Sequence, residues 1–77
     1  MNHKVLVLKD LINEVVKRRG GIRSFTFSDL KTDSLSENEK IRLINKMIDV
    51  KIVYPFAGEY LLVNNWEEWW EEIEKGE

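Results

Sequence analysis

A chain of 77 residues with a formal net charge of −2 has room for one small domain, 1–77. A domain of this size buries only about 60% of its unfolded surface, which disfavours a large catalytic cleft. Because the chain has no cysteine, disulfides and thiolate metal sites are excluded. Its apolar runs are too short to cross a bilayer, and its N-terminus lacks the pattern of a signal peptide. We therefore expect a soluble, cytoplasmic protein with no membrane partner.

The charges are distributed unevenly along the chain. Residues 1–65 carry 11 basic and eight acidic side chains, a balance of +3, whereas residues 66–77 carry one basic and six acidic side chains, a balance of −5. The net acidity argues mildly against a nucleic-acid partner, but it comes from the tail. The body of the chain is mildly basic.

Residues 5–19 predict a first helix, because apolar side chains recur there at helical spacing. The apolar positions are Val5, Leu8, Leu11, Ile12, Val15 and Val16. Lys17, Arg18 and Arg19 follow at the end where cations compensate the helix dipole, and the same triplet also suits contact with phosphate. Gly20 and Gly21 supply the left-handed residue that commonly ends a helix.

The next segment predicts a short strand and then two helices. Residues 22–25 are extended and bounded by glycine, so we expect them to pair with a later strand. Thr26 and Asp29 have the spacing of a capping box, which predicts a short helix from about residue 27 to residue 32. A tight connection leads to Ser36 and Glu39, which repeat that spacing at the start of a longer helix, 36–51. Two helices joined in this way form a helix-turn-helix arrangement.

The helix at 36–51 has one apolar half and one polar half. The apolar half contains Ile41, Leu43, Ile44, Met47, Ile48 and Val50; the polar half contains Asn38, Arg42, Asn45, Lys46 and Asp49. Amides and cations are the groups that read base edges and hold phosphates, although they are also common on solvated helix surfaces.

Residues 52–56 and 59–63 predict a β-hairpin, since both are rich in β-branched and aromatic residues. Ala57-Gly58 lies between them as the turn, with glycine supplying a positive φ. Pro55 has no amide hydrogen, so its strand must be an edge strand. Pairing with residues 22–25 would complete a three-stranded sheet.

The tail predicts a helix at 65–75 with a narrow apolar stripe surrounded by glutamates. The stripe consists of Trp66, Trp69, Trp70 and Ile73. Three tryptophans are a large apolar area for so small a chain. We expect them to cover the first helix, to complete a homodimer with a second copy, or to do both.

In this order, the elements resemble a winged helix-turn-helix domain, an α+β fold. The resemblance rests on residues 25–30, on 36–44, and on 48–53 leading to 58–63. It covers 5–63, with the helix at 65–75 as an addition, and the composition is similar to that of small archaeal winged-helix regulators of plasmids and viruses. Lys51 departs from the pattern, because many members have a glycine at the end of this helix.

The resemblance implies that the recognition helix 36–51 enters the major groove of double-stranded DNA and that the wing 52–63 lies on the backbone. The implied groove contacts are Asn38, Arg42, Asn45 and Lys46. The implied phosphate contacts are Ser28, Lys31, Lys17, Arg18, Arg19 and Arg23. Glu39, Asp49 and Glu59 would repel phosphate if they faced it.

No chemistry for an enzyme is recognisable. His3 is the only histidine, so a metal site or a catalytic triad has no material, and we expect no cofactor. The main hypothesis is a DNA-binding regulator of transcription. The alternative is a winged-helix accessory subunit of the transcription or replication machinery that binds a protein partner through Trp66, Trp69 and Trp70.

Overall fold

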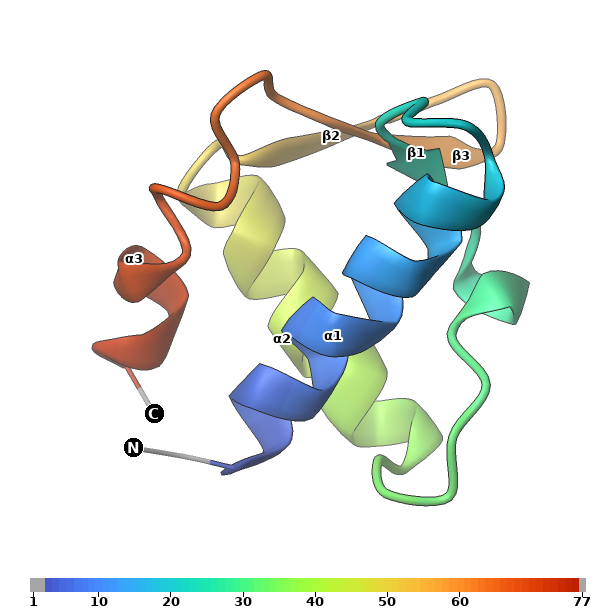
Figure 1. Cartoon of the computed structure of the whole chain (residues 1–77). Helices are drawn as coiled ribbons and strands as arrows, with labels where there is room; N and C mark the ends of the chain where they lie inside the picture. The colour runs from blue at the N-terminus through green and yellow to red at the C-terminus, as the bar shows by residue number, and fades with distance from the viewer. Residues whose placement is uncertain (1–2, 77) are drawn as a thin grey trace.

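The computed structural model describes residues 3–76, which form a small α+β domain with three α-helices and a three-stranded antiparallel sheet (Figure 1). The elements in chain order are α1 (His3–Arg18), β1 (Ser24–Phe25), the 3-10 helix η1 (Phe27–Asp29), α2 (Glu37–Asp49), β2 (Val53–Phe56), β3 (Glu59–Leu62) and α3 (Glu71–Glu74). This order is compatible with a winged helix.

The predicted first helix is confirmed as α1, and it ends as its glycines indicate. Gly20 has a φ of +71°. The amide of Gly20 donates to the carbonyl of Lys17 at 3.0 Å, and the amide of Gly21 donates to that of Val16 at 2.9 Å. This pair of bonds is the Schellman motif, which satisfies carbonyls that the end of a helix leaves without partners.

The sheet has the strand order β1-β3-β2, so the predicted pairing of residues 22–25 with the hairpin is confirmed, over Ser24 and Phe25. Ser24 pairs with Leu61, and Phe25 pairs with Tyr60. The β2–β3 turn has a φ of +52° at Ala57 and +80° at Gly58, the signs of a type I′ turn. Pro55 lies in β2 at the edge of the sheet, as expected.

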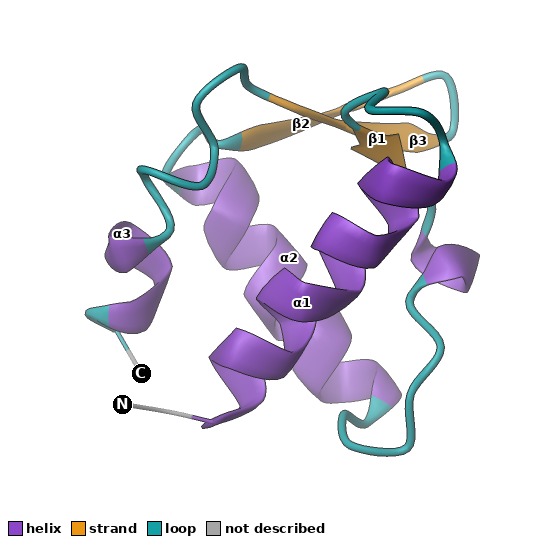
Figure 2. Cartoon of the chain, in the orientation of Figure 1, coloured by secondary structure: helices purple, strands orange, loops and turns teal. Residues whose placement is uncertain are grey.

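One apolar core fills the space between the sheet and the helices, which lie on one face of the sheet (Figure 2). Among its fully buried members are Leu8 and Ile12 of α1, Leu43 and Met47 of α2, and Phe25 of β1. The Phe25 ring stacks on Tyr60 with a centroid separation of 5.3 Å. The core therefore fixes α1 and α2 relative to the sheet.

The predicted second helix is wrong in length. In place of a helix over 27–32, the chain makes the single turn η1, in which the amide of Leu30 donates to the carbonyl of Phe27 at 3.1 Å. The chain then extends, and this allows both Leu30 and Leu35 to reach the core. The predicted capping box forms, with the amide of Thr26 donating to the carboxylate of Asp29 at 2.8 Å, but burial of the two leucines outweighs continuation of the helix, because helical propensity is the weaker effect.

The predicted C-terminal helix, 65–75, is also wrong in extent, since only α3 is α-helical. Residues 64–70 form successive turns, such as the bond at 3.2 Å from the amide of Trp69 to the carbonyl of Trp66. Glutamates four residues apart, as at Glu67 and Glu71, repel each other along an α-helix. The backbone of residues 64–70 therefore follows the burial of Trp66 and Trp70 in the core.

Lys51 has the left-handed backbone conformation that a glycine has at the end of this helix in the winged-helix pattern. Its φ is +65°. Its amide donates to the carbonyl of Ile48 at 3.0 Å, while the amide of Ile52 donates to that of Met47 at 3.1 Å, which is a second Schellman motif. A residue with a Cβ is strained in this left-handed conformation.

We expect Lys51→Gly to stabilise the fold by about 0.5–1 kcal/mol, because glycine relieves the strain at a positive φ. Part of this gain is lost, because glycine also makes the unfolded chain more flexible. Urea unfolding measures the change. Lys51→Ala is the matched control, since it removes the same charge but keeps the Cβ. An equal gain in both variants would show that the charge, and not the backbone, is responsible.

Candidate nucleic-acid interface

A capping box fixes the N-terminus of α2, as the sequence predicts. The amide of Glu39 donates to the hydroxyl of Ser36 at 3.1 Å, and the amide of Ser36 donates to the carboxylate of Glu39 at 2.9 Å. Lys4 of α1 also forms an ion pair with Glu39. The Lys4 ammonium first, and the Ser36 amide second, lower the pKa of Glu39 to about 2. This carboxylate therefore stays ionised in the folded chain, and the positive charge of Lys4 compensates its negative charge.

The polar stripe of α2 is exposed. Asn38, Arg42 and Asn45 are all exposed and lie four and three residues apart, so they share one side of the helix. Ile41 lies beside them with 48% of its surface exposed. The sequence analysis placed Ile41 in the buried half, and that assignment is wrong. In the sequence, only the position of Ile41 at the edge of the apolar half indicated that it could be exposed.

Lys46 does not belong to this stripe. Its Nζ lies where a Cβ on Gly76 would be built, so the side chain reaches toward the C-terminal segment. Asp49 is exposed in the last turn of α2. Of the four expected groove contacts, the structure brings three together.

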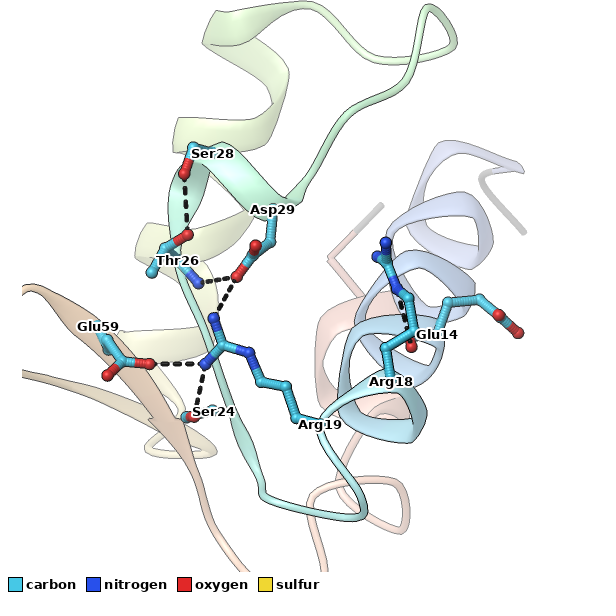
Figure 3. A network of polar contacts seen from close by, with 8 residues as sticks. All are labelled: Glu14, Arg18, Arg19, Ser24, Thr26, Ser28, Asp29 and Glu59. Atoms are coloured by element: carbon cyan, nitrogen blue, oxygen red, sulfur yellow. Dashed lines mark hydrogen bonds and ion pairs between the residues drawn. The ribbon is translucent and has the colours of Figure 1, made fainter.

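Arg19 is the centre of a polar network that joins four segments (Figure 3). Its guanidinium donates to the carboxylate of Glu59 at 2.7 Å, to that of Asp29 at 2.8 Å and to the hydroxyl of Ser24 at 2.9 Å. The hydrogen bond to Glu59 is the main cause that raises the pKa of Arg19. The pKa of Asp29 is lowered, first by the amide of Thr26 and also by Arg19. In this conformation Arg19 holds protein carboxylates, where a phosphate contact was expected.

The other expected phosphate contacts are exposed but do not share one face. They are Lys17, Arg18, Arg23, Ser28 and Lys31. Lys17 and Arg18 end α1, which buries its apolar stripe in the same core as α2. Asn38 lies in the first turn of α2, and in Figure 1 α2 begins far from the sheet whereas α1 ends close to it.

The C-terminal stripe packs into the chain's own core. Trp66, Trp70 and Ile73 are buried, with Trp66 and Trp70 edge to face at a centroid separation of 5.8 Å. Trp69 is 49% exposed. The alternative hypothesis of three tryptophan anchors for a partner is therefore wrong for Trp66 and Trp70, because packing against the core already uses their surfaces.

The described residues hold no group of three or more histidine, aspartate or glutamate side chains that could hold a metal ion. No helix within residues 3–76 is both long and apolar enough to cross a membrane. No protein-family model matches the chain, and no curated protein or solved structure is detectably similar to it.

The lowered pKa of Glu39 predicts a loss of stability in acid. Since the pKa falls from 4.5 to about 2 on folding, the contribution of this group is complete above the unfolded value and is lost as the pH falls through the folded value. We expect Glu39→Gln to flatten the decline in unfolding free energy between about pH 5 and about pH 2. Urea unfolding across this range tests it. Glu68→Gln, which removes an exposed glutamate from residues 64–70, should leave the decline unchanged.

We expect Arg19→Lys to lower the urea midpoint, because one ammonium cannot reproduce a planar fork that binds three acceptors. Arg18→Lys is the matched control, since the Nε of Arg18 makes one long hydrogen bond, at 3.4 Å to the carbonyl of Glu14, and lysine keeps the positive charge that also acts on Asp29. Equal midpoints for the two variants would contradict the central place of Arg19.

Proposed function

We propose that this protein is a winged-helix regulator of transcription that binds double-stranded DNA with α2 in the major groove. The observation that carries the proposal is the exposed stripe of Asn38, Arg42 and Asn45 on α2. This helix occupies the position of a recognition helix in the order α1–β1–η1–α2–β2–β3, with the sheet order β1-β3-β2. As part of this proposal, the regulator acts in the cytoplasm of an archaeal cell.

Each side chain of the stripe has a partner on the base edges of the major groove. The planar guanidinium of Arg42 matches the two acceptors of guanine, and the amides of Asn38 and Asn45 match the acceptor and donor of adenine. Ile41, exposed beside them, offers an apolar contact for the methyl group of thymine. The helix therefore combines polar and apolar readout.

The ion pairs of the fold weaken two obstacles to an anionic partner. Glu39 is paired with Lys4, and Glu59 shares Arg19 with Asp29, so the repulsion that each carboxylate exerts on an anion is reduced. Asp49 lies in the last turn of α2, whereas the N-terminal residues of a recognition helix make most base contacts. Lys31 and Arg23 are exposed cations for the flanking phosphates.

The hairpin contributes less than the helix. Its tip carries Phe56 and Ala57 and no cation, so it can lie along the backbone without strong phosphate contacts. Affinity therefore rests on a few cations and on the stripe, which favours binding as a homodimer to two half-sites about one helical turn apart.

We expect Arg42→Ala to cost about 1–3 kcal/mol on the preferred duplex and much less on a random duplex, because it removes a base contact. Fluorescence anisotropy with labelled duplexes selected from mixed genomic fragments measures both, at low and at near-physiological salt. Binding should weaken steeply as salt is added. Lys9→Ala, which removes one positive charge from α1, is the control, and circular dichroism checks that each variant folds.

Two results would contradict the proposal. Equal losses on preferred and random duplexes would remove Arg42 from the base contacts. No binding of the wild-type chain at low salt would reject DNA as the partner of α2.

A further inference from the structure

A surface hollow of about 330 Å³ lies where the end of α2 meets the chain that leaves β3. It is lined by Val50, Lys51, Ile52, Val63, Asn65 and Trp69. Its volume is at the small end of the range for small-molecule sites, roughly 300–1,000 Å³. In Figure 1 the segment after β3 turns back past this end of α2 before it reaches α3.

The walls of the hollow differ in chemistry. Val50, Ile52 and Val63 give it an apolar floor. The Trp69 side chain, 49% exposed, stands at its side, whereas Trp66 and Trp70 are buried. An exposed indole presents a flat face on which another ring can stack.

The polar groups of the hollow are a cation and an amide. Lys51 is the only charged side chain among the described residues that line it, and Asn65 is the only side-chain amide. Both are exposed. An ammonium and an amide N–H are donors that suit an anionic oxygen.

The backbone at Lys51 gives a second reason to consider this place. A lysine occupies a left-handed position, φ +65°, where glycine would be free of strain. Strained non-glycine residues concentrate at binding sites, because the side chain that causes the strain is needed there. Two non-glycine residues in the described part of the chain have a positive φ; Ala57 forms the β2–β3 turn, and Lys51 is the cation of the hollow.

We propose that the hollow binds a small, flat aromatic acid, with its ring on Trp69 and the apolar floor and its acid group at Lys51 and Asn65. Charge complementarity selects the class, since the lining holds one cation and no carboxylate among the described residues. The site involves none of the stripe residues on α2, so it is independent of the DNA-binding proposal.

The test is a titration of the ¹⁵N-labelled full chain with salicylate, followed by the amide and indole N–H resonances. We expect saturable shifts in residues 50–52 and 63–65 and in the Trp69 indole. Salicylamide keeps the ring without the charge, and cyclohexanecarboxylate keeps the charge without the aromatic ring. Each should bind about two- to fivefold more weakly, as expected for the loss of one exposed charged or stacking contact.

Two variants locate the site. Trp69→Ala should abolish saturable shifts at residues 50–52, and Lys51→Gly should weaken salicylate about two- to fivefold while leaving salicylamide unchanged. Lys51→Gly is also expected to stabilise the fold, so weaker binding cannot be attributed to unfolding. Phe56→Ala is the matched control, because it removes an aromatic ring that is 66% exposed and lies outside the hollow.

Three outcomes would overturn the proposal. Shifts that grow linearly without saturation would show non-specific contact only. Equal affinity for salicylate and salicylamide would remove the role of Lys51. An equal effect of Phe56→Ala and Trp69→Ala would show that any exposed ring suffices.

Discussion

One guanidinium connects four segments around the apolar core of this fold. Arg19 follows the last residue of α1 and binds Ser24 of β1, Asp29 of η1 and Glu59 of β3, so it connects every element that precedes α2 to the hairpin that follows it. A planar fork presents five donors spread over three nitrogens, whereas the three donors of a lysine radiate from a single nitrogen. In a chain this small, with a limited core, such a connection adds to the apolar packing that holds these elements together.

This network also determines the electrostatics of the surface. Glu59 and Asp29 each form an ion pair with Arg19. A separate ion pair, between Lys4 and Glu39, compensates the charge of the carboxylate at the start of α2. A chain with a net charge of −2 therefore presents a stripe of amides and a guanidinium on α2 with its nearest acids compensated. The net charge of the whole chain bears on its solubility, whereas the charges near the stripe determine which partners that face of α2 attracts.

Much of the fold could be predicted from local patterns. The glycines after α1, the capping box at Ser36 and Glu39, and the turn before Gly58 each specify a backbone conformation through residues a few positions apart, and each prediction is confirmed. The site could be predicted less completely. Asn38, Arg42 and Asn45 share a face because helical spacing requires it, but the exposure of Ile41 depends on where the neighbouring elements end.

By itself, the sequence determined the place of α1 and α2 to within two residues at each end, the hairpin and its pairing with β1, because periodicity, caps and turns are local properties. Only the tertiary structure decided that η1 is a single turn, that residues 64–70 are not an α-helix, and that Arg19 binds protein carboxylates. It also decided that Trp66 and Trp70 are buried whereas Trp69 is exposed. These outcomes depend on competition for a shared core and on partners up to 40 residues away, which no local pattern encodes.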